Sequence, residues 1–421
     1  MKLLVIGAGM MGSAAAFDMG RQPDVESVTL ADADLATARR AAFRVNRLLR
    51  AGGRTRAVLT HARIVAVRLD ARDRKAAARL MRGHAATLSA VPYFFNLGLC
   101  RAAIAAGCHF ADLGGNNTVV RQEYALAPRA AKRGIAIAPD CGLSPGMASV
   151  LAGELVRRLE TTHGKKPRGR LADALKIYVG GLPRHPKPPF SYQLVFSVEG
   201  LINEYAEPAS ILRDGKMVAI EPLTELENFP MEGFGTLEAF HTSGGTSTMP
   251  ETFRGRVGEC FEKTLRYPGH FAMVRSLYDL GFFGKEKMRM GAARVSPRQV
   301  TARLFIDQLS SAEPDVCIMR VEAHRGRRVT SFSMVDYFDP ATGMTAMMRT
   351  TAWPASIVVM MMARGVIAKR GGIHQETDVP GQMFLDEMGR RGVEIRFRKS
   401  AISSRQVLGP ALDANKKLRS G

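Results

Sequence analysis

Short apolar segments alternate with amphipathic, alanine-rich segments over the first 145 residues of the chain. The apolar segments end at polar or glycine-rich positions, which is typical of parallel strands joined by helical crossovers. We therefore predict an α/β fold whose first part is a doubly wound parallel sheet. The expected strands cover residues 1–6, 26–31, 64–69, 86–91, 109–113 and 135–138.

The pattern changes after residue 145, where longer polar strands replace most of the crossover helices. We predict a second, α+β domain over residues 146–351 with a largely antiparallel sheet. A helix should begin after Ser296, because serine caps helices and Pro297 suits a first turn. From Pro354 the pattern is helical again, and the basic tail over residues 399–421 lacks periodicity and is expected to be mobile. The expected strands are residues 174–179, 193–198, 316–323, 329–338 and 344–351.

Composition narrows the classes of protein that this chain can represent. The formal net charge is +21, but the basic residues are spread along the chain without a nucleic-acid-binding motif, so we expect no nucleic-acid partner. No apolar run approaches the roughly 20 residues that span a bilayer, and the first strand leaves no room for a secretory signal. The five cysteines are scattered without metal-ligand spacing. A cytoplasmic location without disulfides or a metal site is therefore expected.

Three glycines follow the first strand in the spacing Gly-x-Gly-x-x-Gly, at Gly7, Gly9 and Gly12. In a strand–turn–helix context this spacing is typical of a Rossmann dinucleotide-binding turn, in which the helix N-terminus receives the pyrophosphate. Asp32 ends the second strand, where a carboxylate can bind the adenosine ribose. That charge favours NAD over NADP, although the pair Arg39-Arg40 leaves NADP open. The other cofactor contacts that we expect are Met10, Met11, Asp70, Ala90 and Val91.

Titratable side chains follow three strands of the predicted sheet. Tyr93, Asp112 and Cys141 stand at the ends of the fourth, fifth and sixth strands. Because the carboxyl ends of parallel strands meet at one edge of a sheet, we expect these side chains to lie together and to act in catalysis. Each also has a structural interpretation, as a core aromatic, a helix cap and a small buried side chain.

Polar residues of the second domain form two further candidate groups. The loop 241–248 is rich in hydroxyls and glycines that can hold a carboxylate or an amine, and Arg266 can bind a carboxylate through two parallel hydrogen bonds. Arg266 could instead form an interdomain ion pair, and His270 could contact a helix N-terminus. The substrate contacts that we expect are Gly142, Thr242, Ser243, Gly244, Thr246, Arg266 and His270.

Several segments of the chain together resemble the saccharopine dehydrogenase family. The segments occur in the order expected for the family, and the resemblance extends to about residue 397. Within it, residues 196–200 and 237–248 look most like lysine 6-dehydrogenase. The resemblance implies that Tyr93, Asp112 and Cys141 line the substrate site. It also implies that residues 352–398 return to the NAD(P)-binding domain of residues 1–145, and that the second sheet supports a homodimer. The segments that carry the resemblance are residues 7–12, 91–93, 139–146, 180–183, 241–248 and 266–270.

The expected activity is an NAD(P)-dependent oxidation of a C–N bond in lysine or in a lysine adduct such as saccharopine, by hydride transfer and imine hydrolysis. Lysine-type amines are charged at neutral pH, so a side chain must take a proton first. Asp112 is our candidate base, with Tyr93 or Cys141 relaying the proton. A dehydrogenase for another amino-acid or polyamine conjugate, and a catalytically silent nucleotide-binding sensor or scaffold, remain as alternatives.

Overall fold

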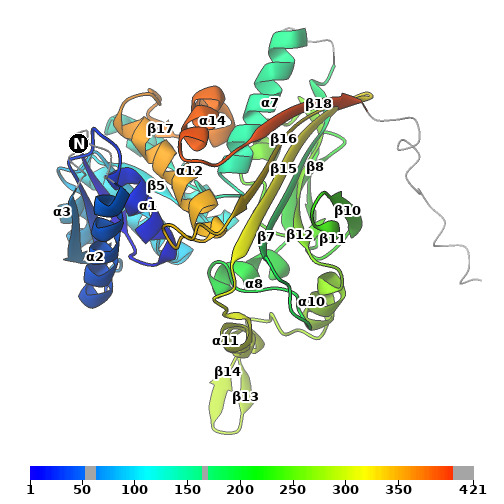
Figure 1. Cartoon of the computed structure of the whole chain (residues 1–421), viewed down its shortest axis with the longest axis horizontal. Helices are drawn as coiled ribbons and strands as arrows, with labels where there is room; N and C mark the ends of the chain where they lie inside the picture. Colours follow the sequence, from blue (N-terminus) through cyan, green and yellow to red (C-terminus); the bar gives the residue numbers. More distant parts are fainter. Residues whose placement is uncertain (53–62, 164–168, 402–421) are drawn as a thin grey trace, which may run out of the picture.

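Two β-sheets organise the chain, as the computed structural model in Figure 1 shows for residues 1–52, 63–163 and 169–401. The first sheet is parallel, with seven strands in the order β17-β6-β5-β4-β1-β2-β3. Residues 3–6 of β1 are fully buried, as a strand covered on both faces requires. Its strands are β1 (Lys2–Ile6), β2 (Ser27–Asp32), β3 (Arg63–Arg68), β4 (Ala86–Ser89), β5 (His109–Asp112), β6 (Ala136–Ala138) and β17 (Gly371–Gly372).

Helices cover both faces of the first sheet, and alternate residues of β1 face the two layers. Leu3 and Val5 pack with the helices α1, α2 and α12 (Ala346–Ala363), whereas Leu4 and Ile6 pack with α3, α4 and α6. This is the doubly wound arrangement that the sequence predicts. The helices of this part are α1 (Met10–Gly20), α2 (Leu35–Gly52), α3 (Arg74–Met81), the short 3₁₀ turn η1 (Tyr93–Phe95), α4 (Asn96–Ala106), α5 (Asn117–Tyr124) and α6 (Ala127–Lys132).

The second sheet is mixed and largely antiparallel, which confirms the predicted fold class. Its main path runs β10-β11-β12-β7-β15-β16-β18, and among its described strands only β12 and β7 pair in parallel. The strands are β7 (Ala172–Pro183), β8 (Ala209–Arg213), β9 (Lys216–Ile220), β10 (Glu227–Met231), β11 (Gly235–His241), β12 (Val257–Arg266), β15 (Asp315–Arg325), β16 (Arg328–Tyr337) and β18 (Arg396–Ala401).

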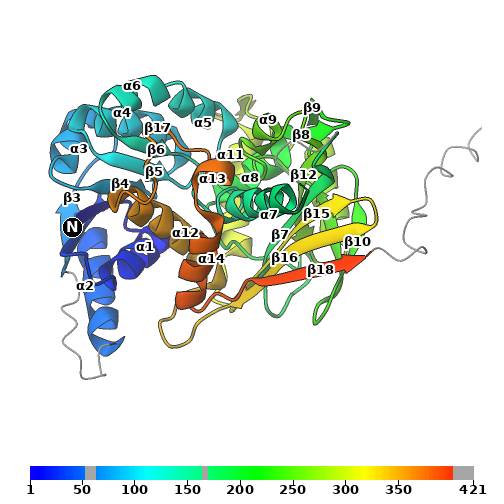
Figure 2. The same ribbon diagram turned by 90° about the horizontal axis from the view of Figure 1, so that it is seen from above.

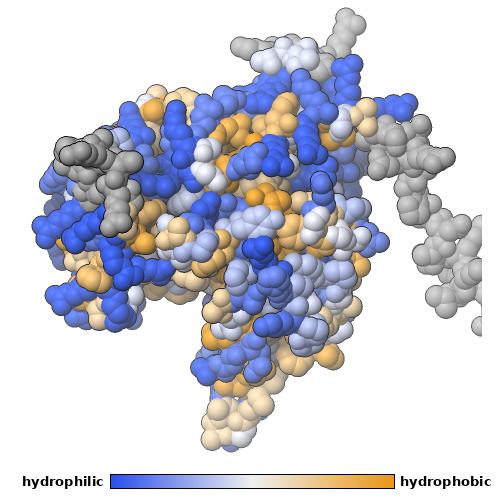
Figure 3. All heavy atoms as spheres, viewed as in Figure 1, coloured by the Kyte–Doolittle hydropathy of each residue, from blue (hydrophilic) through white to orange (hydrophobic). Residues whose placement is uncertain are grey.

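Helices pack around this second sheet, and a two-stranded hairpin projects beyond it. Ser296 caps α11 and forms a reciprocal capping box with Gln299, as expected for that helix start. Figure 3 shows apolar side chains on the projecting hairpin, where Met288 and Met290 are exposed. The elements are α7 (Met147–His163), α8 (Val198–Ala206), α9 (Met249–Thr252), α10 (His270–Asp279), β13 (Met288–Met290), β14 (Ala293–Val295) and α11 (Pro297–Leu309).

One buried helix, α12 (Ala346–Ala363), joins the two sheets. The predicted strand over 344–351 is wrong, and so is the predicted helix start at Pro354, which lies inside α12. The helix begins earlier because the Asp315 carboxylate accepts hydrogen bonds from the first two N–H groups of α12, at 2.7 and 2.9 Å. A carboxylate at a helix N-terminus satisfies donors that the helix itself leaves open. No helix within the described ranges has the length and apolarity needed to cross a bilayer.

After α12 the chain returns to the first sheet and then crosses back. β17 pairs with β6 in parallel, followed by α13 (Gln375–Asp378) and α14 (Gly381–Arg390). β18 then pairs with β16 of the second sheet, as Figure 2 shows. Residues 396–401 therefore belong neither to the nucleotide-binding part nor to a loose tail, and 402–421 lies outside the described residues. The predicted strand over 193–198 is also absent, because Ser197 there caps α8.

Candidate active site

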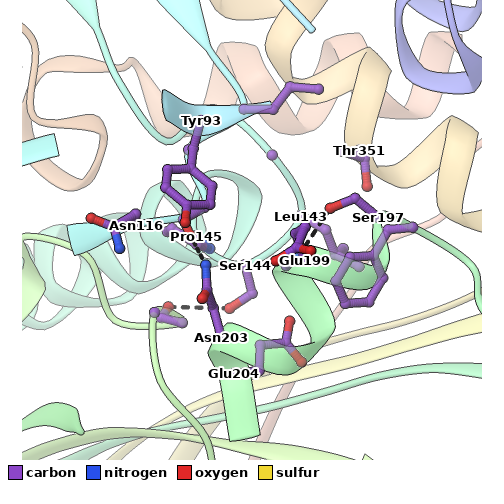
Figure 4. A pocket seen from close by; sticks show the side chains of 18 of the residues that line it. Tyr93, Asn116, Leu143, Ser144, Pro145, Ser197, Glu199, Asn203, Glu204 and Thr351 are labelled. Atoms are coloured by element: carbon purple, nitrogen blue, oxygen red, sulfur yellow. Dashed lines mark hydrogen bonds between the residues drawn. The ribbon is translucent and has the colours of Figure 1, made fainter. Parts of the chain in front are cut away.

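A cavity of about 580 Å³ lies between the first sheet and the second domain. The first domain contributes the start of α1 and the loops after β4, β5 and β6. The second domain contributes α8, the loop after β11 and one face of β12. Figure 4 shows Glu199, Asn203 and Glu204 of α8 at the cavity. Because the loops after the strands lie at the carboxyl edge of the parallel sheet, the cavity occupies the place where α/β proteins bind ligands.

The glycine turn at the start of α1 leaves space beside free backbone donors. A side chain at Gly7 would meet the Ala90 carbonyl at 2.6 Å, and one at Gly12 would meet the Gly7 carbonyl at 1.8 Å, so both glycines are required by packing. Around Gly9, no atom of the described residues other than its chain neighbours lies within 4 Å of such a position. The Gly9 carbonyl already accepts from Ser13, which leaves the earlier N–H groups of the helix for an anion. The turn fits a dinucleotide pyrophosphate.

Other predicted cofactor residues divide into two groups. Met10, Met11, Ala90 and Val91 line the cavity with Gly9. Asp70 does not line the cavity. Its carboxylate is exposed and pairs with Arg72 at 2.7 Å, and the hydrogen bonds from Arg72 lower the pKa of Asp70 to about 2.

Asp32 lies at the end of β2, where the ribose is expected. Its Oδ2 accepts from the Ala8 N–H at 2.8 Å and its Oδ1 from the Asp34 N–H at 3.0 Å. The carboxylate therefore holds the glycine turn against β2.

Tyr93 stands at the start of η1 and lines the cavity. Its ring packs on Gly115, where an added side chain would meet it at 3.4 Å, and it points toward Asn116 and Asn203 (Figure 4). Asn203 donates to the Gly115 carbonyl at 3.2 Å and ties α8 to this loop. Tyr93 is thus brought to the cavity as predicted.

Asp112 does not reach the cavity. It is completely buried, and its Oδ1 accepts hydrogen bonds from the N–H groups of Gly114 at 2.7 Å and Asp140 at 3.3 Å. Its other oxygen faces Glu123, whose two oxygens have no other partner among the described residues. Burial raises the pKa of both carboxyls, and the Asp112 charge raises that of Glu123 further. Glu123 therefore keeps a proton, and Asp112 positions two loops that line the cavity.

The buried Glu123 gives a testable dependence of stability on pH. Its pKa rises from the ordinary 4.5 to about 11, so the folded chain holds a proton that the unfolded chain releases above pH 4.5. The free energy of unfolding must then fall as pH rises through that window. We expect Glu123→Gln, which keeps a donor toward Asp112, to be stabilising, with a gain that grows by up to about 1.4 kcal/mol per pH unit.

Urea unfolding of the Glu123→Gln variant at pH 5.5 and pH 8 checks this expectation. The exposed Glu232→Gln variant is the matched control and should show no such growth with pH. An equal effect of Glu123→Gln at both pH values would mean that Glu123 is ionised in the folded chain.

Asp140 lines the cavity at the strand ends, where the sequence predicted Asp112 to lie. It does so although only 2% of it is exposed, and its Oδ2 accepts from Ser247 at 2.6 Å. Its φ of 62° turns the side chain back over Gly114, where no side chain could fit. Burial raises its pKa to about 7, and the neighbouring charge of Asp112 acts in the same direction. A carboxyl poised near neutrality can both accept and return a proton.

Cys141 follows Asp140 but does not line the cavity. Its thiol is fully buried and donates to the Ala138 carbonyl at 3.2 Å. Burial raises the pKa of the thiol well above its usual value, so it stays protonated. The structure therefore places Cys141 in the core, whereas Gly142 lines the cavity.

Only part of the predicted loop 241–248 of the second domain lines the cavity. Thr242, Ser243 and Gly244 line it, whereas the Thr246 hydroxyl donates to the Ser210 carbonyl at 2.7 Å and lies outside. The Thr242 hydroxyl contacts the Glu262 carboxyl of β12 at 3.3 Å. Burial raises the pKa of Glu262 well above its usual value.

Arg266 lines the cavity from the end of β12 and is 3% exposed. Its Nε donates to the Tyr205 hydroxyl at 3.1 Å, and its guanidinium lies 4.7 Å from the Tyr192 ring centre. Tyr205 in turn donates to His270 Nε2 at 3.0 Å. His270 does not line the cavity; burial lowers its pKa to about 3, so it is a neutral acceptor behind Tyr205. His270 therefore fixes Arg266 indirectly.

Glu204 on α8 faces Arg266, with 3.6 Å between Oε2 and Nη2. Burial raises its pKa to about 7, against the opposing effect of Arg266. Sequence analysis missed Glu204 and Glu262 as site residues, and it placed Asp140 at a strand end without giving it a role. Two patterns could have revealed the first two. Glu262, Thr264 and Arg266 stand at alternate positions on one face of β12. Asn203 and Glu204 of α8, with Glu207 just after the helix, are spaced as one polar helix face.

The parallel sheet, the glycine turn and the interdomain cavity define a two-domain protein with an NAD(P)-binding domain. Profiles of the saccharopine dehydrogenase NADP binding domain and C-terminal domain match residues 3–137 and 142–393. The chain belongs to the saccharopine dehydrogenase family.

The curated relatives are distant and longer than this chain. Saccharopine dehydrogenase [NADP(+), L-glutamate-forming] of Schizosaccharomyces pombe is 26% identical over 60% of this chain and 55% of its own length. Mitochondrial alpha-aminoadipic semialdehyde synthase of Mus musculus is 28% identical over 36% of this chain and 16% of its own length. The chain thus spans about half the length of the first relative, and much less of the second.

Solved structures support the fold. Apo saccharopine dehydrogenase (L-Glu forming) from Saccharomyces cerevisiae matches with a TM-score of 0.74 and 16% identity, over 95% of this chain and 100% of that chain. The homospermidine synthase of Legionella pneumophila in complex with NAD matches with a TM-score of 0.68 and 11% identity, over 100% of this chain and 95% of that chain. At these identities the likeness concerns the fold alone.

Proposed function

We propose that this protein is an NAD(P)-dependent oxidoreductase that oxidises a C–N bond of lysine or of a lysine adduct. The observation that carries this proposal is that one cavity is lined by the first turn of α1, by Arg266 and by two carboxyls. These carboxyls, Asp140 and Glu204, each have a pKa of about 7. An amino-acid substrate presents a carboxylate and an amine, and these side chains complement both groups.

The residues that would hold the cofactor are the first-turn N–H groups of α1, with Asp32 at the ribose and Ala90 and Val91 beside the cavity. When bound, NAD(P)⁺ supplies a hydride acceptor. The remaining contributions belong to the chain: orienting the amine, removing its proton and restricting water.

Asp140 is the proposed base. An ammonium cannot expel hydride from its carbon until the nitrogen has lost a proton, and Oδ1 of Asp140 is free of hydrogen bonds from the described residues. The proton passes to Asp140, the hydride leaves the carbon, and the C–N bond becomes an imine. Water then adds to that carbon, and the nitrogen departs as ammonia or as the released amine. Tyr93 also lines the cavity and orients the reacting nitrogen.

Incubation with NAD⁺ or NADP⁺ and a panel of lysine, lysine adducts and polyamine conjugates tests the proposal through the absorbance of the reduced cofactor. Reduction with lysine or an adduct supports it. Reduction only with a polyamine conjugate would favour the alternative dehydrogenase. Cofactor binding without reduction by any amine would favour a silent nucleotide-binding protein.

Cofactor choice follows from charge at the end of β2. A 2′-phosphate would lie against Asp32 and Asp34, and Arg40 is already engaged with Thr37 at 2.7 Å. We therefore expect a higher kcat/KM for NAD⁺ than for NADP⁺, although the matching domain profile is named for NADP. Asp32→Ala should narrow the ratio, and Asp70→Ala, which changes an exposed carboxylate outside the cavity, should not. A native preference for NADP⁺ in steady-state kinetics would refute the charge argument.

A further inference from the structure

Acidic side chains that line the cavity far outnumber basic ones. Five carboxyls line it, and Arg266 is the one basic side chain among the described lining residues. This imbalance is local, because the chain as a whole has a net charge of +21. The lining carboxyls are Asp140, Glu199, Glu204, Glu207 and Glu262.

Two of these carboxyls form ion pairs with basic residues from outside the cavity lining. Glu199 pairs with Arg298 at 2.9 Å, and Glu207 pairs with Lys285 at 3.1 Å. Both basic side chains are thereby committed and do not line the cavity. The described lining residues therefore offer no second cation for an anionic group of a ligand.

The other three carboxyls share one cation. Glu204 lies 3.6 Å from Arg266, whereas Asp140 and Glu262 form no ion pair within the described part of the chain. Asp140 and Glu262 are 2% and 4% exposed, so water screens them little. Burial raises the pKa of each of these carboxyls, and for Glu204 it does so against the opposing effect of Arg266. A ligand ammonium would supply the missing charge and favour the ionised carboxylate.

From this balance we propose that the cavity selects a substrate that is a net cation with no more than one carboxylate. The inference rests on the proposed function and narrows its substrate class. The single carboxylate lies at Arg266, and the ammonium groups lie toward Asp140 and Glu204. Any further carboxylate would lie among the lining acids without a second described cation to pair with it.

The two substrate types left open by the sequence differ in this respect. Lysine carries one carboxylate and two ammonium groups, so it is a net cation at neutral pH. Saccharopine carries three carboxylates for two nitrogens and is a net anion. The charge pattern therefore favours lysine-type amines over the tricarboxylate adduct, although the relative from Schizosaccharomyces pombe is named for saccharopine.

Isothermal titration of the protein saturated with NAD⁺ measures this selection directly. The ligands are L-lysine, cadaverine (lysine without its carboxylate) and saccharopine, each also tested for reduction of NAD⁺. We expect lysine to bind at least about 10²-fold more tightly than saccharopine, with cadaverine still binding. Glu204→Gln should shrink that ratio about tenfold, whereas the exposed Glu286→Gln, with the same change in net charge, should leave it intact.

Binding or turnover of saccharopine at the level of lysine would overturn the selection while supporting the oxidoreductase. Tight binding of lysine without any reduction would leave the selection standing and refute the proposed function. An unchanged lysine-to-saccharopine ratio in Glu204→Gln would also count against the inference, provided that the variant keeps the native unfolding temperature.

Discussion

Asp140→Asn is expected to lower kcat for amine oxidation by about 10²–10⁴-fold, the usual contribution of a general base. Asparagine keeps the size of the side chain and can still accept from Ser247, but it cannot take the ammonium proton. Cofactor affinity should stay within about threefold of native, because Asp140 lies away from the glycine turn. Steady-state kinetics with cofactor titration by fluorescence give both quantities.

The pH profile separates a base from a structural acid at position 140. With a pKa of about 7, Asp140 is ionised only above neutrality, so kcat/KM should fall on the acid side with a midpoint near 7. Ser247 donates to the carboxylate and lowers its pKa, so Ser247→Ala should move that midpoint to higher pH. Retained turnover in Asp140→Asn, or an unmoved midpoint in Ser247→Ala, would assign the base elsewhere.

The first sheet could be predicted from sequence because its strands are buried on both faces. Such strands are continuous apolar runs, and the glycine turn after the first of them is a strong local signal. The prediction of a strand over 344–351 was wrong, because a short segment of alternating apolar and polar residues is compatible with both a strand and a helix. The start of α12 is fixed by Asp315, a residue distant in sequence whose carboxylate holds its first turn. The prediction for residues 396–401 was wrong for a similar reason, because these residues form a strand through their pairing with β16, which is distant in sequence.

The site shows a different limit. The strand ends after β5 and β6 were correctly identified as a place of titratable groups, but sequence position does not say which carboxyl faces a ligand. Asp112 points into the core toward Glu123, and Asp140 turns into the cavity because its backbone adopts a positive φ above Gly114. A residue other than glycine in that conformation is uncommon and costs free energy, which packing around the site must offset. Such geometry leaves no trace in hydrophobic patterning.

Arg266 is the residue whose predicted role depends most on its surroundings. Two of its five N–H donors are used, by Tyr205 at 3.1 Å and by the Leu265 carbonyl at 2.9 Å. The Nη2 group faces Glu204 without a hydrogen bond, so a ligand carboxylate can compete for it. The guanidinium is held rigidly by Tyr192 and by the Tyr205–His270 pair, which lowers the entropic cost of binding.

Arg266→Met is therefore expected to raise the apparent substrate constant for lysine by about 10²-fold or more. This corresponds to the loss of roughly 2–4 kcal/mol, between a charge-assisted hydrogen bond and a buried ion pair. Nucleotide affinity should barely change. Arg266→Lys keeps the charge without the planar fork and should give an intermediate constant. The decisive comparison is cadaverine, which has no carboxylate, so its constant should be nearly the same in the native protein and in Arg266→Met. If the lysine constant stays native while the unfolding temperature falls, Arg266 serves only as the counterion of Glu204, and the carboxylate binds elsewhere.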